Sequence, residues 1–145
     1  MAYILIAEDE QAINDLICKN LKLLGHRTAQ AFDGAQTMQL IAEENFDLVL
    51  LDVMMPQMSG FEVKSKLPAD LPVIFVTAKN SVSDQLTGLN LGADDYIVKP
   101  FDVLVLIARV ENVRRRTKKN DTIFAINNCV IDLAKRIVLN DGKEV

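Results

Sequence analysis

Short apolar segments alternate with segments of helical periodicity along roughly the first 117 residues. The clearest strand candidates are largely apolar and rich in branched side chains, which is typical of strands buried on both faces. They span residues 3–7, 46–51 and 73–76, with weaker candidates at 27–32 and 96–98. Between them, apolar residues recur at spacings of three and four, as in helices. The helix candidates span residues 13–24, 35–44, 61–67, 83–91 and 103–113. This alternation predicts an α/β fold with a parallel sheet and helices on both faces.

The composition changes after the last predicted helix. Residues 114–121 are polar and mostly basic, which indicates a helix end followed by a linker, placed at 118–122. Residues 123–145 contain short apolar runs and the hairpin signal Asn140-Asp141-Gly142. About two dozen residues cannot bury a core of their own. We therefore expect the start of an antiparallel β element that is incomplete in this chain.

Composition and charge narrow the class of protein. Half of the 145 residues are hydrophobic and 25% are charged, which excludes a disordered chain, a fibrous repeat and a disulfide scaffold. No apolar run reaches the roughly 20 residues of a membrane helix, and residues 1–7 lack the basic start of a signal peptide. With only Cys18 and Cys129, we expect a cytoplasmic protein. Residues 1–99 carry a net charge of −7 and residues 100–145 one of +3, so the acidic body does not resemble a nucleic-acid binder.

Polar side chains follow four of the predicted strands. Glu8 and Asp9 come after the first strand, Asp52 after the third, Thr77 after the fourth and Lys99 after the fifth. Taken singly, such an acid is more typical of a helix cap, and such a lysine of the surface. Because the carboxyl ends of parallel strands share one edge of the sheet, the set together predicts a functional site.

Three clustered carboxylates repel one another unless a proton or a cation lies among them. Oxygen ligands in a partly hydrated site suit Mg²⁺. A carboxylate such as Asp52, beside Mg²⁺, can attack phosphorus and become an acyl phosphate. Lys99 would neutralise charge on the phosphoryl group, and Thr77 could donate a hydrogen bond to it.

The motifs that surround these residues are similar to those of a known family. The matching segments are 4–10, 50–56 with 59–62, 76–78 and 92–101. In this order and spacing they resemble the receiver domain of a two-component response regulator of the OmpR/PhoB family. The resemblance implies a flavodoxin-like (βα)5 fold with strand order 2-1-3-4-5, a receiver domain over residues 1–117, and a winged-helix DNA-binding domain whose first strands occupy 123–145.

The resemblance also assigns metal and phosphoryl roles. Asp52 matches the phosphoacceptor. Glu8 and Asp9 match the acidic pair, with Asp9 the direct Mg²⁺ ligand and Glu8 acting through water. Met54 occupies the position whose backbone carbonyl binds the metal.

Further residues match the family's switch. Thr77 and Lys99 correspond to the residues that contact the phosphoryl group. Thr77 and Tyr96 correspond to the switch pair, in which the hydroxyl moves to a phosphoryl oxygen and the ring swings inward. The resemblance also implies a cis peptide bond between Lys99 and Pro100.

The function implied is that of a phosphoacceptor rather than an enzyme, with at most weak self-dephosphorylation. A sensor histidine kinase would supply the phosphoryl group, and transcription would be controlled through the DNA-binding domain, the only part expected to contact DNA. The single histidine, His26, follows Gly25 in a predicted turn, so we expect it to be exposed and far from the strand ends. The phosphohistidine donor is therefore expected to be a separate protein.

The resemblance further implies a homodimer formed on phosphorylation through the fourth helix, fifth strand and fifth helix. Charged residues at matching positions are Asp94, Asp95, Arg109 and Arg115. Thr87 and Val105 depart from the family pattern, because a basic residue and a glutamate are common there. One exposed ion pair is lost, which predicts a weakened or altered dimer, since such a pair contributes only about 0–1 kcal/mol.

Three rival functions share some of these features. A haloacid-dehalogenase-type phosphatase also uses an aspartate after a strand, but needs a second acid where this chain has Met54. A flavodoxin needs a Ser/Thr-rich phosphate loop where this chain has Glu8-Asp9-Glu10. A plain interaction module would not need the acidic pair and Lys99 together. Phosphorylation by a small-molecule donor separates all three from a receiver.

Overall fold

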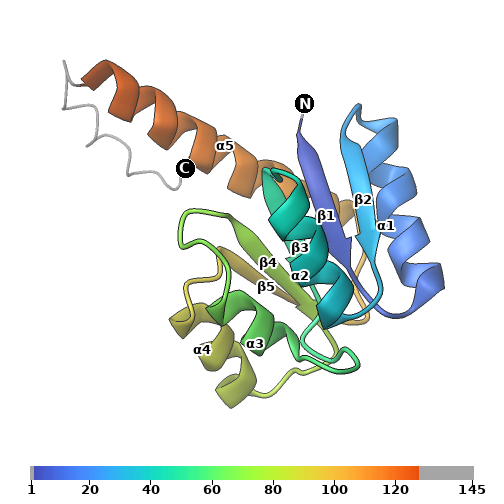
Figure 1. Cartoon of the computed structure of the whole chain (residues 1–145). Coiled ribbons are helices and arrows are strands. Elements are labelled where there is room, and N and C mark those ends of the chain that lie inside the picture. Colours follow the sequence, from blue (N-terminus) through green and yellow to red (C-terminus); the bar gives the residue numbers. More distant parts are fainter. Residues whose placement is uncertain (1, 128–145) are drawn as a thin grey trace. The chain divides into compact units, whose positions relative to one another are not determined.

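The computed structural model describes residues 2–127, with side chains described up to residue 116. Over this range five strands alternate with five helices (Figure 1). The strands are β1 (Tyr3–Ala7), β2 (Arg27–Ala31), β3 (Leu48–Leu51), β4 (Val73–Thr77) and β5 (Asp95–Val98). The helices are α1 (Gln11–Leu23), α2 (Gly34–Glu43), α3 (Gly60–Ser65), α4 (Val82–Asn90) and α5 (Val103–Asn127). The chain divides into two compact units, Met1–Glu111 and Asn112–Val145, and the sheet belongs to the first.

All five strands run parallel in the order β2-β1-β3-β4-β5. The register aligns Ala7 of β1 with Ala31 of β2 and Leu51 of β3. Leu51 is in turn paired with Phe75 of β4. Because the strands end nearly level, the residues that follow β1 and β3 meet at one edge. The predicted sheet, its strand order and its flavodoxin-like class are confirmed.

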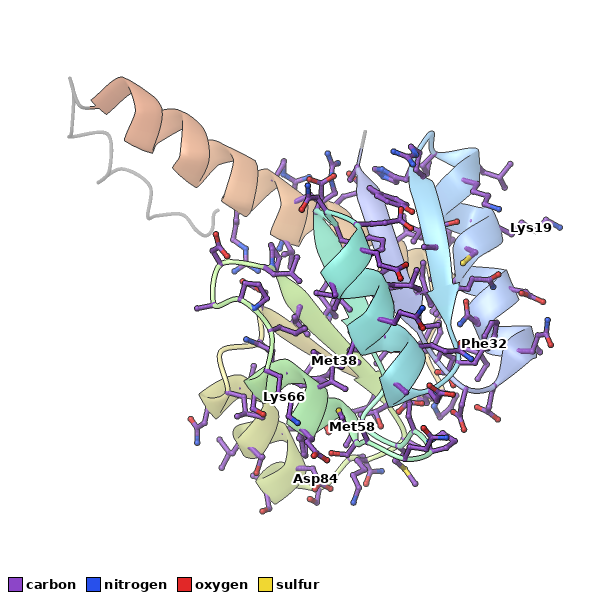
Figure 2. The ribbon with its side chains drawn as sticks, viewed as in Figure 1. Lys19, Phe32, Met38, Met58, Lys66 and Asp84 are labelled. Carbon is purple, nitrogen blue, oxygen red and sulfur yellow. The ribbon has the colours of Figure 1, made fainter. Side chains whose placement is uncertain are left out.

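Successive residues of each strand point to opposite faces of the sheet, so the fold has two apolar layers. On one face, Leu5, Val49 and Phe75 form a core cluster with Val63 of α3, against which Met38 of α2 packs. Figure 2 shows Met38 among the side chains beneath α2. The other face buries strand residues such as Ile4 and Leu50, and it is covered by α1 and the start of α5, as right-handed crossovers require for this strand order.

Local signals explain where the helices begin and end. Asp33, Ser59 and Ser81 precede α2, α3 and α4, and each side chain accepts a hydrogen bond from a backbone amide of the first turn. After α1 the chain turns at Gly25, whose φ of 91° lies in the left-handed region that favours glycine. These boundaries lie within a few residues of the predicted ones.

The structure differs from prediction after residue 117. α5 continues to Asn127, through the expected linker at 118–122 and the first residues of the expected strands. A polar, mostly basic segment predicts a linker here, but arginine and lysine are good helix formers, and no glycine or proline occurs between Pro100 and Gly142. The remaining expected strands, at 128–145, lie outside the described residues, so the incomplete winged-helix domain stays a prediction.

The expectation that His26 is exposed is wrong. Its side chain is buried, and Nδ1 accepts a hydrogen bond from the backbone amide of Ala2 at 3.1 Å. Nε2 lies 2.6 Å from Oε2 of Glu111 on α5. His26 therefore joins the start of β2 to β1 and α5, at the opposite end of the sheet from the acidic residues.

Candidate functional site

Three carboxylates meet at the carboxyl edge of the sheet. Glu8 and Asp9 follow β1, and Asp52 follows the adjacent strand β3. One oxygen from each of the three lies within 4.8 Å of the others. Glu8 and Asp52 are only 2% and 3% exposed, whereas Asp9 is exposed to solvent. The predicted acidic cluster is thus present, with two buried acids and one at the surface.

Lys99 reaches these acids from the end of β5. Its Nζ lies 2.9 Å from Oδ2 of Asp52 and 2.7 Å from Oε1 of Glu8. Glu10, whose role sequence reasoning missed, is 3.5 Å from the same ammonium. Burial disfavours the charged lysine, but hydrogen bonding to the two buried carboxylates and their charges outweigh it, so the pKa of Lys99 is raised. The single ammonium of Lys99 therefore offsets only part of the negative charge carried by the four acids Glu8, Asp9, Glu10 and Asp52.

The pKa of the Glu8 carboxyl group lies near neutral pH. Burial raises the pKa of Glu8 to about 7, although the ammonium of Lys99 and the backbone amide of Glu10 oppose the shift. Oε2 accepts the Glu10 amide at 3.0 Å. Oε1 forms an ion pair with Lys99 at 2.7 Å but has no hydrogen bond of normal geometry among the described residues. A buried oxygen in this position fits a hard cation, so the cluster could hold a metal ion.

Asn14, on α1, fixes the loop that carries the acidic pair. Its side chain is fully buried, and Nδ2 lies 3.0 Å from the carbonyl of Glu8 and 3.2 Å from those of Ile6 and Ala31. The amide therefore ties the end of β1 to the end of β2. Sequence reasoning missed this role; the available signal is a polar residue among the apolar positions of the inner face of α1, next to Ile17.

The loop after β3 holds the Asp52 side chain by backbone contacts. Oδ1 of Asp52 accepts a hydrogen bond from the amide of Met54 at 2.9 Å. A Cβ added at Gly60 would lie 2.2 Å from the carbonyl oxygen of Asp52, so only glycine permits this close approach. The exposed side chain of Met54 adds no polar group to the site.

The two predicted switch residues meet at the backbone of Lys79 rather than at Asp52. Thr77 is fully buried, and its hydroxyl oxygen accepts a hydrogen bond from the amide of Lys79 at 3.3 Å. The Tyr96 phenol donates to the carbonyl of the same residue at 2.8 Å. The Tyr96 ring is 6% exposed, and burial raises its pKa to about 12. The ring thus already occupies the inward position that was expected to follow phosphorylation. The peptide bond between Lys99 and Pro100 is cis, as the resemblance implied.

The charged residues predicted for pairing between chains make contacts within the chain. Arg109 lies 3.1 Å from Oδ1 of Asp95. Asp94 accepts the amide of Val73 at 3.1 Å. In the second unit, Arg115 donates to Asn112 at 3.0 Å. Sequence reasoning missed the apolar character of the neighbouring surface, whose exposed residues are Val82, Leu86 and Leu89 on α4 and Leu104 and Val105 on α5.

Among the described residues, no helix combines the length and the apolar character needed to span a bilayer.

Comparisons with known proteins agree with this geometry. The response regulator receiver domain family matches residues 4–111. The chain is 38% identical over 152 aligned positions to the probable transcriptional regulator ycf27 of Guillardia theta, covering 98% of this chain and 60% of the relative. It is 36% identical to the transcriptional regulatory protein PcoR of Escherichia coli, covering 100% of this chain and 66% of the relative. The chain thus spans a little under two thirds of the length of these relatives.

Solved structures show the same fold. The receiver domain of the Francisella response regulator 1452 matches 81% of this chain and 99% of its own length, with a TM-score of 0.77 and 34% identity. The family match covers residues 4–111, a range that includes Glu8, Asp9, Asp52 and Lys99. The chain therefore belongs to the response regulator receiver domain family and is of the OmpR/PhoB type.

Proposed function

We propose that this chain is a phosphorylation-controlled switch that accepts a phosphoryl group on Asp52. The observation that supports this most strongly is the position of Asp52, which is buried beside Glu8 and 2.9 Å from the ammonium of Lys99. A carboxylate in this setting is close to both a candidate cation site and a fixed positive charge. Both features favour attack on an electron-rich phosphoryl donor.

Mg²⁺ is the cofactor we propose, because the donors present are carboxylate and carbonyl oxygens. Asp9 and Asp52 would bind it directly, Glu8 through a water molecule, and Met54 through its backbone carbonyl. The approach of one oxygen each from Glu8, Asp9 and Asp52 to within 4.8 Å, and the exposed position of Asp9, open to hydrated ions, support this donor set. When bound, the ion would offset the repulsion among the acids and the charge on the phosphoryl oxygens.

In the proposed step, a carboxylate oxygen of Asp52 forms a bond to phosphorus while the bond between phosphorus and the donor atom breaks. The donor atom leaves with the electron pair and takes up a proton. Lys99, already in place, balances negative charge on the transferred group. Thr77 would release the amide of Lys79 and donate its hydroxyl hydrogen to a phosphoryl oxygen, which requires movement of the loop after β4.

We propose a sensor histidine kinase as the donor and control of transcription as the output. The relatives named above are called transcriptional regulators, and their similarity extends over nearly the whole chain rather than ending at residue 111. DNA contact is assigned to a domain that begins after the receiver. Phosphorylation would promote a symmetric dimer through α4, β5 and α5, with Asp94, Asp95, Arg109 and Arg115 contributing charge.

Rapid turnover as a phosphatase is not part of this proposal. Hydrolysis of an aspartyl phosphate needs a group that moves a proton to or from water. The position two residues after Asp52 is Met54, whose thioether cannot do so. We therefore expect slow loss of the phosphoryl group.

The test is incubation with Mg²⁺ and acetyl phosphate, followed by mass measurement of the intact chain. We expect one phosphoryl group per chain in the wild type and none in Asp52→Asn, which keeps the shape but removes the nucleophile. Asp70→Asn, an exposed acid away from the site, is the matched control and should be labelled normally. Full labelling of Asp52→Asn would refute the assignment, and rapid multiple turnover of acetyl phosphate would favour a phosphatase.

A further inference from the structure

Gly88 lies where α4 passes closest to the ring of Tyr96. A Cβ built on Gly88 would lie 2.7 and 2.8 Å from two ring carbons of Tyr96, and 3.1 Å from a ring carbon of Phe75. A Cβ atom essentially never approaches another heavy atom to less than 3.0 Å, so a side chain at position 88 would force the ring or the helix to move.

Backbone conformation does not explain this glycine. In the described residues, the glycines with positive φ are Gly25 and Gly92, whereas Gly88 lies within α4. Glycine is among the poorest residues for the interior of a helix, and alanine would favour α4 locally. The close approach of the Tyr96 ring is therefore the feature that requires glycine at this position.

The ring cannot retreat toward the sheet to make room. Tyr96 packs against Phe75, with ring centroids 5.8 Å apart, and Phe75 is fully buried. Phe75 is in turn held by the edge-on ring of Phe61 at 5.3 Å. The phenol of Tyr96 is tied to the carbonyl of Lys79, which precedes α4. If position 88 carried a side chain, the Tyr96 ring would rotate outward, because this movement disturbs the fewest packed groups.

We propose that Gly88 is a positioning residue that sets the state of the switch: the absence of a side chain there admits the Tyr96 ring between α4 and Phe75. Replacing Gly88 keeps the ring outside this space. Phosphorylation of Asp52 is then uncoupled from the surface formed by α4, β5 and α5. This inference rests on the proposed function only where it links the ring to phosphorylation, since the placement of the ring is a matter of packing alone.

The position of the ring can be measured directly. The full chain labelled with 3-fluorotyrosine carries two reporters, Tyr3 and Tyr96, and Tyr3→Phe leaves only the second. We expect the fluorine signal of Tyr96 to shift in Gly88→Ala and to become several-fold more sensitive to a soluble paramagnetic gadolinium chelate. Ser83→Ala, at an exposed position of α4, is the control and should change neither. An unchanged Tyr96 signal in Gly88→Ala would overturn the proposal.

A second experiment follows the output in the same variants with acetyl phosphate and Mg²⁺. Gly88→Ala should be labelled on Asp52 at a rate close to that of the wild type, yet lose most of the phosphorylation-dependent dimerisation seen by sedimentation. Normal dimerisation in Gly88→Ala would overturn the link to output. If the wild type itself is not labelled, the proposed function fails, while the fluorine experiment still decides whether Gly88 places the ring.

A double-mutant cycle covers the case in which Gly88→Ala alone folds poorly. Removing the ring by Tyr96→Ala removes the two closest contacts and leaves only the contact with Phe75 at 3.1 Å. Gly88→Ala should therefore destabilise the wild type much more than it destabilises the Tyr96→Ala background. Urea unfolding of the four chains measures this difference. An equal loss of stability in both backgrounds would show that position 88 acts through something other than the ring, and would overturn the proposal.

Discussion

The ammonium of Lys99 lies 2.9 Å from Oδ2 of Asp52, and this pair joins the end of β5 to the end of β3 across the intervening strand β4. Both side chains are largely shielded, with 12% and 3% of their surfaces exposed. The pair therefore holds the proposed nucleophile and its charge partner in place before any donor or metal ion binds.

Replacing Lys99 should leave the buried acids without their cation. We expect Lys99→Met to lower the free energy of unfolding by about 3 kcal/mol, the usual cost of removing one partner of a buried ion pair. Millimolar Mg²⁺ should restore part of this loss, because it supplies the missing positive charge. Urea unfolding with Mg²⁺ and with a chelator is the measurement, and Lys79→Met, at an exposed position, is the control. A loss of stability as small as in the control would contradict the structural role of the pair.

Mg²⁺ should stabilise the wild type through the three acids. At a concentration 100 times its Kd, a ligand of the native state adds about 2.7 kcal/mol to the free energy of unfolding. Asp9→Asn removes the exposed ligand, so the response to Mg²⁺ should shrink. The metal-free variant should be at least as stable as the wild type, because one repelling charge is gone. Thermal unfolding with increasing Mg²⁺ tests both points, with Asp70→Asn as control. An unchanged melting temperature in the wild type would mean that the acids do not bind the ion.

The pH dependence of stability should carry the signature of Glu8. Its pKa is raised from 4.5 to about 7 in the folded chain, so the native state holds this proton more tightly than the unfolded state. The resulting stabilisation is complete below pH 4.5 and is lost as the pH rises through about 7. In metal-free protein, Glu8→Gln should remove this decline. Urea unfolding across this pH range measures it, and parallel curves for wild type and variant would refute the shift.

Asn14 should affect metal binding without contacting the metal. Asn14→Leu removes the donor that the carbonyls of Ile6, Glu8 and Ala31 share, although Ala31 still accepts the backbone amide of Glu8. A buried polar group that is left unsatisfied costs about 1–3 kcal/mol. We expect a comparable loss of stability together with a weaker response to Mg²⁺, because the Glu8 loop is freed. Thr37→Val is the matched control, since it removes the hydrogen bond that the buried Thr37 hydroxyl on α2 donates to the carbonyl of Asp33. It should lower stability and leave Mg²⁺ affinity unchanged; an equal effect on affinity would show that Asn14 is only structural.

The dimer should depend on apolar contact more than on charge. Leu104 and Val105 are apolar and exposed, and Thr87 carries no charge. Phosphorylation should promote dimerisation with a mild dependence on salt. Arg115→Glu should weaken the dimer. The double change Thr87→Arg with Val105→Glu should strengthen it by less than about thirtyfold, since a symmetric dimer forms the pair twice and each exposed pair contributes about 0–1 kcal/mol. Sedimentation at low and high salt is the measurement, and monomers throughout would exclude this surface.

The sequence alone was enough to predict the sheet and its functional edge. Strands such as 3–7 and 73–76 are apolar because both of their faces are covered, and this requirement is visible residue by residue. Once the strands are parallel, the residues that follow them must share an edge, whatever their side-chain conformations. Glu8, Asp52 and Lys99 could therefore be brought together without knowing any distance.

The tertiary structure decided the features that depend on residues far apart in the chain. Burial of Glu8 sets its pKa, the carbonyl of Ala31 gives Asn14 part of its role, and the contact with Glu111 buries His26. The sequence marks Asn14 only as a polar residue on the apolar face of α1 and gives no signal of its partners, because each of these features arises from packing between elements. The position of the Tyr96 ring also depends on packing between elements. A tyrosine in a strand can be buried or exposed, and the close approach of α4 at Gly88 decides that the Tyr96 ring is buried.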